Sequence, residues 1–211
     1  MSSTNRPPQE ARPAYMRLFL TFLPMACVGT LLHEGGHIAV ARALGYSTTL
    51  HFGSMSWFLE EDTSGARWNE QHSFWISVGG PLMNMGLGVI GLVWLAKLAK
   101  RGPIELRGQG LAAVLLALFW SRQVFNLALL GRQLLSESDG PMSDEIKIAL
   151  YLDWPIYSVS ILTALVAAMA VIRTILHVKR TQRLALVVSG ALGSLTGFAL
   201  WYMGIGPLIL P

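Results

Sequence analysis

Charged residues are scarce in this chain of 211 residues. Asp, Glu, Lys and Arg together make up 13% of it, about half of the roughly 25% that is usual in soluble globular proteins. Hydrophobic residues make up 53%, and the mean hydropathy is +0.48. So few charges on so apolar a chain argue against a soluble globular protein and favour a membrane protein.

Cysteine is nearly absent as well. Cys27 is the single cysteine, so an intrachain disulfide is excluded. The chain also has no internal repeat and no low-complexity segment, and its length suits one domain. Residues 1–13 are polar and rich in proline, which predicts a disordered tail. We expect residues 14–211 to form a single transmembrane domain.

What the chain has instead is five long apolar stretches. They cover residues 16–44, 74–98, 111–135, 156–176 and 184–208. Each is long enough to span a bilayer, which takes about 20 residues in a helix. Strand-forming residues follow the first stretch and predict a short β-like hairpin over residues 48–59. The expected fold class is therefore an all-α polytopic membrane protein with about five transmembrane helices and a short hairpin after the first.

The charges in the connections alternate in sign. Residues 97–107 and 173–183 are basic, as is the segment before the first stretch, whereas residues 60–70 and 137–153 are predominantly acidic. The positive-inside rule then places the amino terminus in the cytoplasm of a multi-pass integral membrane protein. This topology also accounts for the net charge of +4, so we expect the lipid bilayer and no nucleic acid as a partner.

Three ionisable residues lie close together in the first apolar stretch: His33, Glu34 and His37. On a helix, the four-residue spacing puts both imidazoles on one face, where they can bind one zinc ion. In metalloproteases with this H-E-x-x-H motif, the glutamate takes a proton from the zinc-bound water. Each ionisable group in a membrane helix costs on the order of 2.5–3.5 kcal/mol on insertion scales. A catalytic zinc site is therefore favoured over a purely structural polar cluster.

A zinc site of this kind needs a third protein ligand. The candidates lie in the acidic connection after the third stretch, on the same predicted side as His33 and His37. They are Asp139, which precedes Gly140, and Asp144, which follows Ser143 and begins a predicted helix. Each also has a structural interpretation, as a turn residue for Asp139 and as a helix cap for Asp144.

Together these patterns resemble the site-2 protease family of intramembrane zinc proteases, peptidase family M50. The helix that carries the H-E-x-x-H motif ends in Gly45, as in that family, and the run from Gly79 to Asn84 resembles its Gly-Pro-x-x-Asn element. The aspartate after the third stretch resembles the third-ligand motif in a divergent form, which indicates a short M50-like branch. The connection over residues 46–73 is too short for a PDZ insertion.

The resemblance implies an intramembrane zinc metalloprotease that hydrolyses peptide bonds of membrane-embedded or membrane-proximal substrates. It implies Zn²⁺ on His33, His37 and Asp144, with Asp139 as the alternative third ligand, and Glu34 as the catalytic base. It also gives Asn84 and Asn126 a role in substrate or oxyanion support.

Two other functions are compatible with the sequence. One is a catalytically inactive zinc-binding membrane scaffold of the same fold, and the other is a small membrane transporter. Glu34 argues against the scaffold, because an inactive relative does not need the base. The basic connections place the site toward the outside, although many members of the resembled family have it toward the cytosol.

Overall fold

The computed structural model of the protein describes residues 15–58, 69–136 and 142–210. These residues are mostly helical and include five helices long and apolar enough to cross a membrane. The five candidate spans are Tyr15–Ala43, Glu70–Ala99, Gly108–Ala128, Ser158–His177 and Arg180–Ile209. The prediction of five membrane-spanning helices is thus confirmed for length and composition. The predicted tail at residues 1–13 lies outside the described residues.

The first span consists of two helices, α1 (Tyr15–Phe22) and α2 (Met25–Ala43). Pro24 lies between them and is the N-cap residue of α2. A proline ring clashes with the preceding turn and lacks an N–H donor, so it starts a helix readily but interrupts a continuous one. Helix α2 ends before Gly45, whose φ of +88° lies in the left-handed region that glycine adopts without strain.

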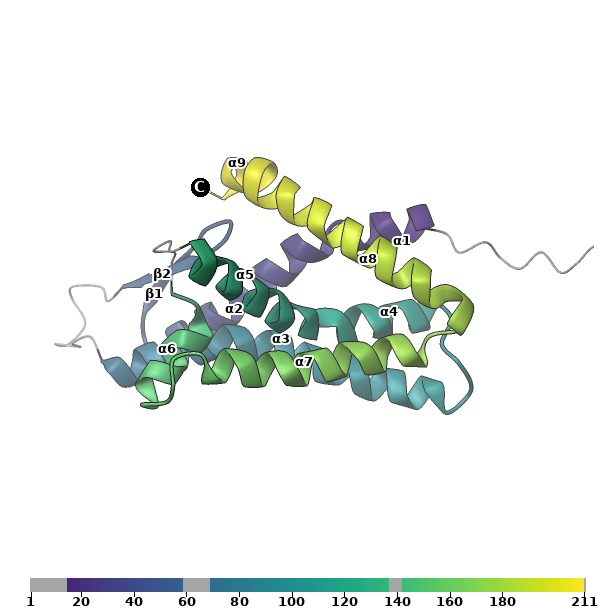
Figure 1. Ribbon diagram of the computed structural model, residues 1–211. Helices are drawn as coiled ribbons and strands as arrows, with labels where there is room; N and C mark the ends of the chain where they lie inside the picture. Colours follow the sequence, from purple (N-terminus) through teal and green to yellow (C-terminus); the bar gives the residue numbers. More distant parts are fainter. Residues whose placement is uncertain (1–14, 59–68, 137–141, 211) are drawn as a thin grey trace, which may run out of the picture.

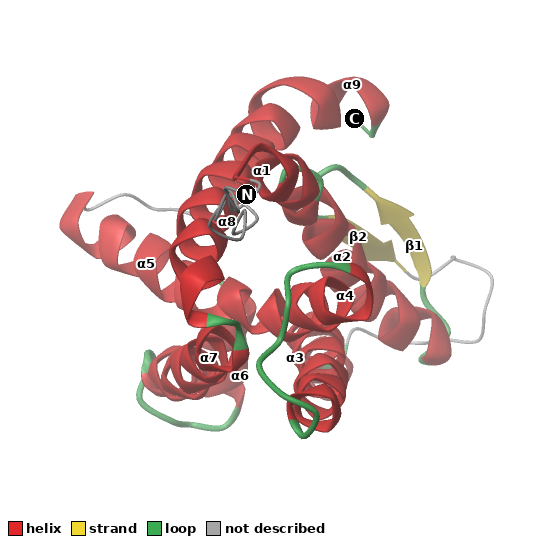
Figure 2. Ribbon diagram, turned by 90° about the vertical axis from the view of Figure 1, so that its right-hand side faces the viewer, coloured by secondary structure: helices red, strands yellow, loops and turns green. Residues whose placement is uncertain are grey.

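A two-stranded antiparallel sheet follows α2, as predicted. Strand β1 (Ser47–Leu50) pairs with β2 (Met55–Phe58), and Ser47 lies opposite Phe58. The hairpin packs beside α2 at the edge of the helical bundle (Figure 2). Its connecting residue Phe52 is fixed to the end of the chain, because its N–H donates to Leu210 O at 3.1 Å and its C=O accepts from Trp201 Nε1 at 2.7 Å.

The remaining elements complete the bundle. In chain order they are α3 (Glu70–Ala99), α4 (Gly108–Ala117), the 3₁₀ turn η1 (Leu118–Trp120), α5 (Ser121–Ser136), α6 (Asp144–Tyr151), α7 (Ser158–His177), α8 (Arg180–Leu200), the π-helical turn η2 (Trp201–Ile205) and α9 (Gly206–Ile209). Helices α3, α4 and α7 run along one another, and α1 and α8, which contact each other, lie obliquely to them (Figure 1). The hairpin and α6 lie at one end of the bundle, and the turn from α7 to α8 lies at the other.

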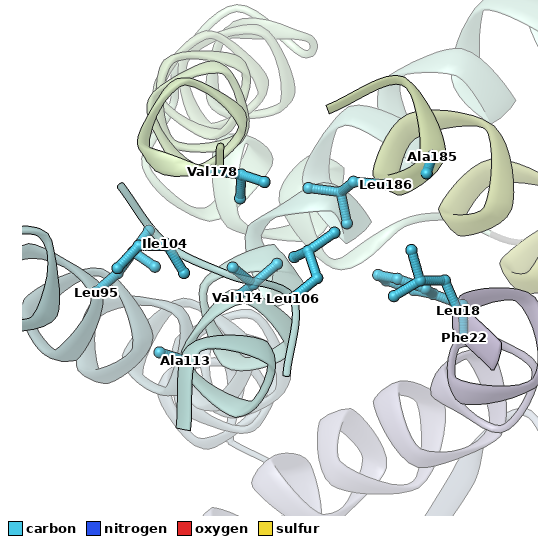
Figure 3. Close-up of a cluster of buried hydrophobic side chains, with 10 residues drawn as sticks. All are labelled: Leu18, Phe22, Leu95, Ile104, Leu106, Ala113, Val114, Val178, Ala185 and Leu186. Atoms are coloured by element: carbon cyan, nitrogen blue, oxygen red, sulfur yellow. The ribbon is translucent and has the colours of Figure 1, made fainter. Parts of the chain in front are cut away.

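The main hydrophobic core lies toward the end away from the hairpin. It joins α1, α3, α4 and α8 with the segment between α3 and α4 (Figure 3). Its buried members are Leu18, Phe22, Leu95, Ile104, Leu106, Ala113, Val114, Val178, Ala185 and Leu186. The segment around Leu106 is held there by two hydrogen bonds of 2.9 Å, one from Arg17 Nη2 to its C=O and one from its N–H to Gln182 Oε1.

Helices α2 and α3 approach so closely that their backbones touch. A Cβ at Gly36 would overlap the carbonyl oxygen of Gly79 and lie 2.8 Å from Met83 Cβ. A Cβ at Gly79 would lie 2.5 Å from the carbonyl oxygen of Gly36. Small residues at a helix interface permit this approach inside a membrane, where dispersion contacts between helices replace the hydrophobic effect. The same contact brings α3 against the face of α2 that carries the histidines.

The neighbouring glycines Gly35 and Gly36 provide a matched test of this contact. We expect Gly36→Ala to lower the free energy of unfolding by about 1–3 kcal/mol, because a methyl group must push α2 and α3 apart. Gly35→Ala should be neutral or stabilising by up to about 1 kcal/mol, since nothing lies within 4 Å of its Cβ position. Thermal unfolding in detergent measures both, and equal stabilities would contradict the packing described.

Candidate metal centre

His33 and His37 lie one turn apart on α2, and both side chains are buried. Their relative exposures are 2% and 5%. The two Nε2 atoms are 3.1 Å apart, and the rings are nearly perpendicular. The helical spacing therefore brings one nitrogen from each imidazole to a common point, as the sequence predicted.

The other nitrogen of each ring contacts α3. His37 Nδ1–H donates to the carbonyl oxygen of Ile76 at 2.6 Å. His33 Nδ1 lies 3.5 Å from the side-chain amide of Asn84, which is 1% exposed. Asn84 Oδ1 has no partner among the described residues, and a half-turn of the amide brings it to His33 Nδ1–H. With the proton on Nδ1, a ring presents the Nε2 lone pair, which is the form that a metal ligand needs. With the proton on Nε2, the ring donates to Asp144 Oδ2 instead.

Gly80 explains why α3 can lie so close to the imidazoles. A Cβ at this position would overlap His37 Nε2 and would lie 2.7 Å from His33 Nε2. Pro81 follows within the same helix. Any larger residue at position 80 would occupy the space in front of both Nε2 atoms. The Gly-Pro-x-x-Asn element of the sequence thus provides this clearance at Gly80 and a hydrogen-bonding amide at Asn84.

Asp144 contacts both histidines from α6. Its Oδ2 lies 3.0 Å from His33 Nε2 and 3.2 Å from His37 Nε2. Asp144 is the first residue of α6, and the N-cap role belongs to Ser143, whose Oγ accepts from Ile146 N–H at 3.4 Å. The helix-cap interpretation of Asp144 is therefore wrong. The alternative ligand Asp139 lies outside the described residues.

The charge of Asp144 is stabilised by its neighbours. Burial opposes ionisation of this carboxyl, but hydrogen bonds with His33 and His37 hold its pKa well below the usual range. The ammonium group of Lys147 lies 3.7 Å from the second oxygen, Oδ1. An ionised carboxylate facing two imidazoles is the form in which aspartate binds a metal.

The geometry of these three residues fits a zinc ion. Zinc lies about 2.0–2.2 Å from nitrogen and carboxylate oxygen ligands, so two ligands of one ion are at most about 4 Å apart. His33 Nε2, His37 Nε2 and Asp144 Oδ2 are mutually separated by 3.0–3.2 Å. With Nδ1 protonated, three acceptors converge on one point, and a cation there removes their mutual repulsion.

Glu34 lies beside this group and is 6% exposed. A ligand atom of Glu34 lies within 4.8 Å of those of His33 and His37. We assign it no ligand position, because Asp144 Oδ2 is closer to both imidazoles. Within the described part of the chain no hydrogen bond to the Glu34 carboxylate is found, which leaves this group available as a base.

Asn126 lies on α5, and its role in substrate or oxyanion support stays a prediction. Its Nδ2 donates to Oε1 of Glu145 at 3.2 Å. Glu145 is 2% exposed, and the sequence interpretation gave it no role in the site. The available signal was its place next to Asp144 in a helix whose other residues, apart from Lys147, are apolar.

Arg122 lies in the third apolar stretch, where an ionisable group needs an anionic or carbonyl partner, and the sequence offers Glu145 or Asp139. The described residues contain no ion pair of Arg122 with Glu145, and Arg122 Nε has no partner among them.

A chain of aromatic rings connects the hairpin with α8 and α5 on the Thr30 side of α2. Phe52 contacts Tyr202 at 5.9 Å between ring centroids, Tyr202 contacts Phe198 at 4.4 Å, and Phe198 contacts Phe125 at 5.2 Å. Tyr202 Oη also lies 3.5 Å from Thr30 Oγ1. Thr30 precedes Glu34 by one helical turn, so these rings lie on the Glu34 side of α2.

Comparison with known proteins gives no relative for this chain. No family model matches it, and neither a curated protein nor a solved structure does. The resemblance to the M50 family therefore rests on the sequence motifs and stays a prediction.

The two candidate third ligands can be distinguished by their effect on metal content. We expect purified wild-type protein to contain about one zinc ion per chain. Asp144→Ala should lower the zinc affinity by at least about tenfold, because it removes a direct ligand. Asp139→Ala should retain the metal. Elemental analysis after dialysis measures the content, and loss of zinc in Asp139→Ala alone would make Asp139 the ligand.

Proposed function

We propose that this protein is an intramembrane zinc metalloprotease. The observation that supports this best is the convergence of His33 Nε2, His37 Nε2 and Asp144 Oδ2. The two histidines and the neighbouring Glu34 lie in a helix apolar enough to cross a membrane, and Asp144 reaches them from α6. This donor set suits zinc, and a neighbouring carboxylate without another partner suits a general base. The expected substrate is a membrane-embedded or membrane-proximal peptide segment.

The proposed reaction is hydrolysis of a peptide bond. His33, His37 and Asp144 would hold the metal, and zinc, when bound, supplies a Lewis acid for the scissile carbonyl. Glu34 takes a proton from the attacking water as the oxygen–carbon bond forms. Glu34 then returns this proton to the leaving amine as the carbon–nitrogen bond breaks. Burial of Glu34 and both histidines keeps bulk water away from this step.

The hairpin is a suitable place for the substrate to be held. It follows α2 directly and lies at the end of the bundle where α6 carries Asp144 (Figure 1). A peptide can be cleaved only when its backbone is extended, and addition to a strand edge is a common way to extend it. We propose that the strand pair over residues 47–58 holds the substrate in this manner.

Substitution of the base separates hydrolysis from metal binding. We expect Glu34→Gln to slow cleavage of a membrane-peptide substrate by about 100- to 10,000-fold, since the amide cannot accept the proton. Zinc content should stay at the wild-type level, because the three proposed ligands are intact. Cleavage of a pool of transmembrane peptides, followed by mass spectrometry, measures the rate.

Glu70→Gln is the matched control, because Glu70 is an exposed residue at the start of α3. It should cleave at the wild-type rate. Cleavage by Glu34→Gln at the same rate would rule out the proposed mechanism. Wild-type protein that binds zinc but cleaves no peptide would instead favour the inactive scaffold.

The orientation in the membrane is a further part of the proposal. Following the basic connections, we expect the amino terminus and the α3–α4 connection in the cytoplasm, and the hairpin and α6 outside. In a Cys27→Ser background, a membrane-impermeant maleimide should label Trp154→Cys in intact cells. It should label Lys100→Cys only after permeabilisation. Both positions are exposed in the structure, and the reverse pattern would place the site toward the cytosol.

A further inference from the structure

We propose that Asn126 is a positioning residue that sets the place of Asp144 through Glu145. This inference rests on the proposed metal-binding function, because it concerns how one of the three ligands is held. It assigns Asn126 a role different from the substrate or oxyanion support that the family resemblance implies.

The contact that carries the inference is the hydrogen bond between α5 and α6. Asn126 Nδ2 donates to Glu145 Oε1 at 3.2 Å, and only 2% of Glu145 is exposed. Glu145 directly follows Asp144 in the first turn of α6. Successive residues on a helix point about 100° apart, since there are 3.6 residues in each turn. Asp144 therefore faces the histidines of α2 while Glu145 faces α5, and the first turn of α6 is held from two sides.

Helix α6 is short and packs against α3 and α7, and the bond to Asn126 attaches its first turn to α5 as well. Helix α6 has eight residues, and its own hydrogen bonds contribute little to fixing its position. A metal ligand must be held to within about 0.5 Å of its productive position. The Ser143 cap fixes where α6 begins, but a cap does not prevent the helix from turning about its axis. The Asn126–Glu145 bond opposes this rotation.

The environment makes the bond costly to lose. Glu145 Oε2 is buried and has no partner among the described residues. Within the same residues, the hydrogen bond to this carboxylate is the one that Oε1 accepts from Asn126. A buried polar group that loses its partner bears the full cost of desolvation. Without Asn126, Glu145 would turn toward other donors or water. Asp144 would move with it, because the two residues share one helical turn.

The amide of Asn126 is also a poor candidate for direct contact with a substrate. One of its two N–H groups donates to Glu145, whereas no contact with a proposed metal ligand is found for Asn126 among the described residues. Asn84, by contrast, has an unpartnered Oδ1 and lies against His33. The two asparagines thus support two different ligands of the proposed centre. Asn84 on α3 supports His33, and Asn126 on α5 supports Asp144.

Zinc affinity, measured by competition with a chromogenic chelator, tests the inference without depending on proteolysis. We expect Asn126→Ala to weaken zinc binding by about ten- to hundredfold, the usual effect of removing a residue that orients a ligand. Asn126→Asp should weaken it at least as much, because it places a second carboxylate against Glu145. The double variant Asn126→Asp with Glu145→Gln reverses donor and acceptor and should restore the affinity to within about threefold of wild type.

A spectroscopic measurement distinguishes positioning from general destabilisation. Cobalt can replace zinc, and its visible bands report the ligand geometry. These bands should shift in Asn126→Ala and return in the double variant. Thr174→Val is the matched control, because Thr174 is a buried polar residue on α7 whose hydroxyl donates within its own helix at 2.8 Å. It should bind zinc and cobalt as wild type does.

The possible outcomes separate this inference from the proposed function. Wild-type affinity and cobalt bands in Asn126→Ala would overturn the positioning role, whatever Glu34→Gln does to cleavage. If Asn126→Ala fails to fold, the comparison of Asn126→Asp with its double variant decides. Equal zinc affinity in those two would overturn the inference, and restoration would support it. A wild-type protein without zinc affinity would contradict the proposed metal centre itself.

Discussion

The contact between the backbones of α2 and α3 is the constraint on which the candidate site depends. Gly36 and Gly79 allow the two helices to touch, and Gly80 leaves the space in which both imidazoles lie. At that distance the carbonyl oxygen of Ile76 can accept from His37 Nδ1–H. A side chain at any of the three glycines would separate the helices or fill the space before the Nε2 atoms. The helix contact thus sets the place of the first two proposed ligands.

Polar groups in apolar helices are expensive, and the structure shows how this cost is reduced. Each ionisable group in a membrane helix costs on the order of 2.5–3.5 kcal/mol on insertion scales. Here Asp144 Oδ2 lies within hydrogen-bonding distance of both imidazoles, and Asn126 donates to one oxygen of Glu145. These polar residues come from α2, α5 and α6. The contacts that offset the free-energy cost of burying them therefore form only after the helices assemble. The bundle and the candidate metal centre therefore depend on each other for their stability.

Much of the fold was predictable because the bilayer imposes simple lengths. The five apolar stretches predicted the five candidate spans, and the strand-forming residues predicted the hairpin; the structure contains both. The break at Pro24 was not predicted, although proline is a known signal for it. The π-helical turn after α8 had no local signal. It lies where Trp201 and Leu210 hydrogen-bond to Phe52 in the hairpin, a contact between segments about 150 residues apart.

The sequence by itself determined how residues on the same helix are placed relative to one another. The spacing of His33 and His37 fixes both on one face of a helix wherever that helix lies, and Glu34 comes with them. Only the tertiary structure decided what meets this face. The sequence left the choice between Asp139 and Asp144 open, and it gave no indication that Asn126 bonds to Glu145. Those contacts join residues from separate helices, and their distances depend on how the helices pack, which the spacing of residues along one helix does not specify.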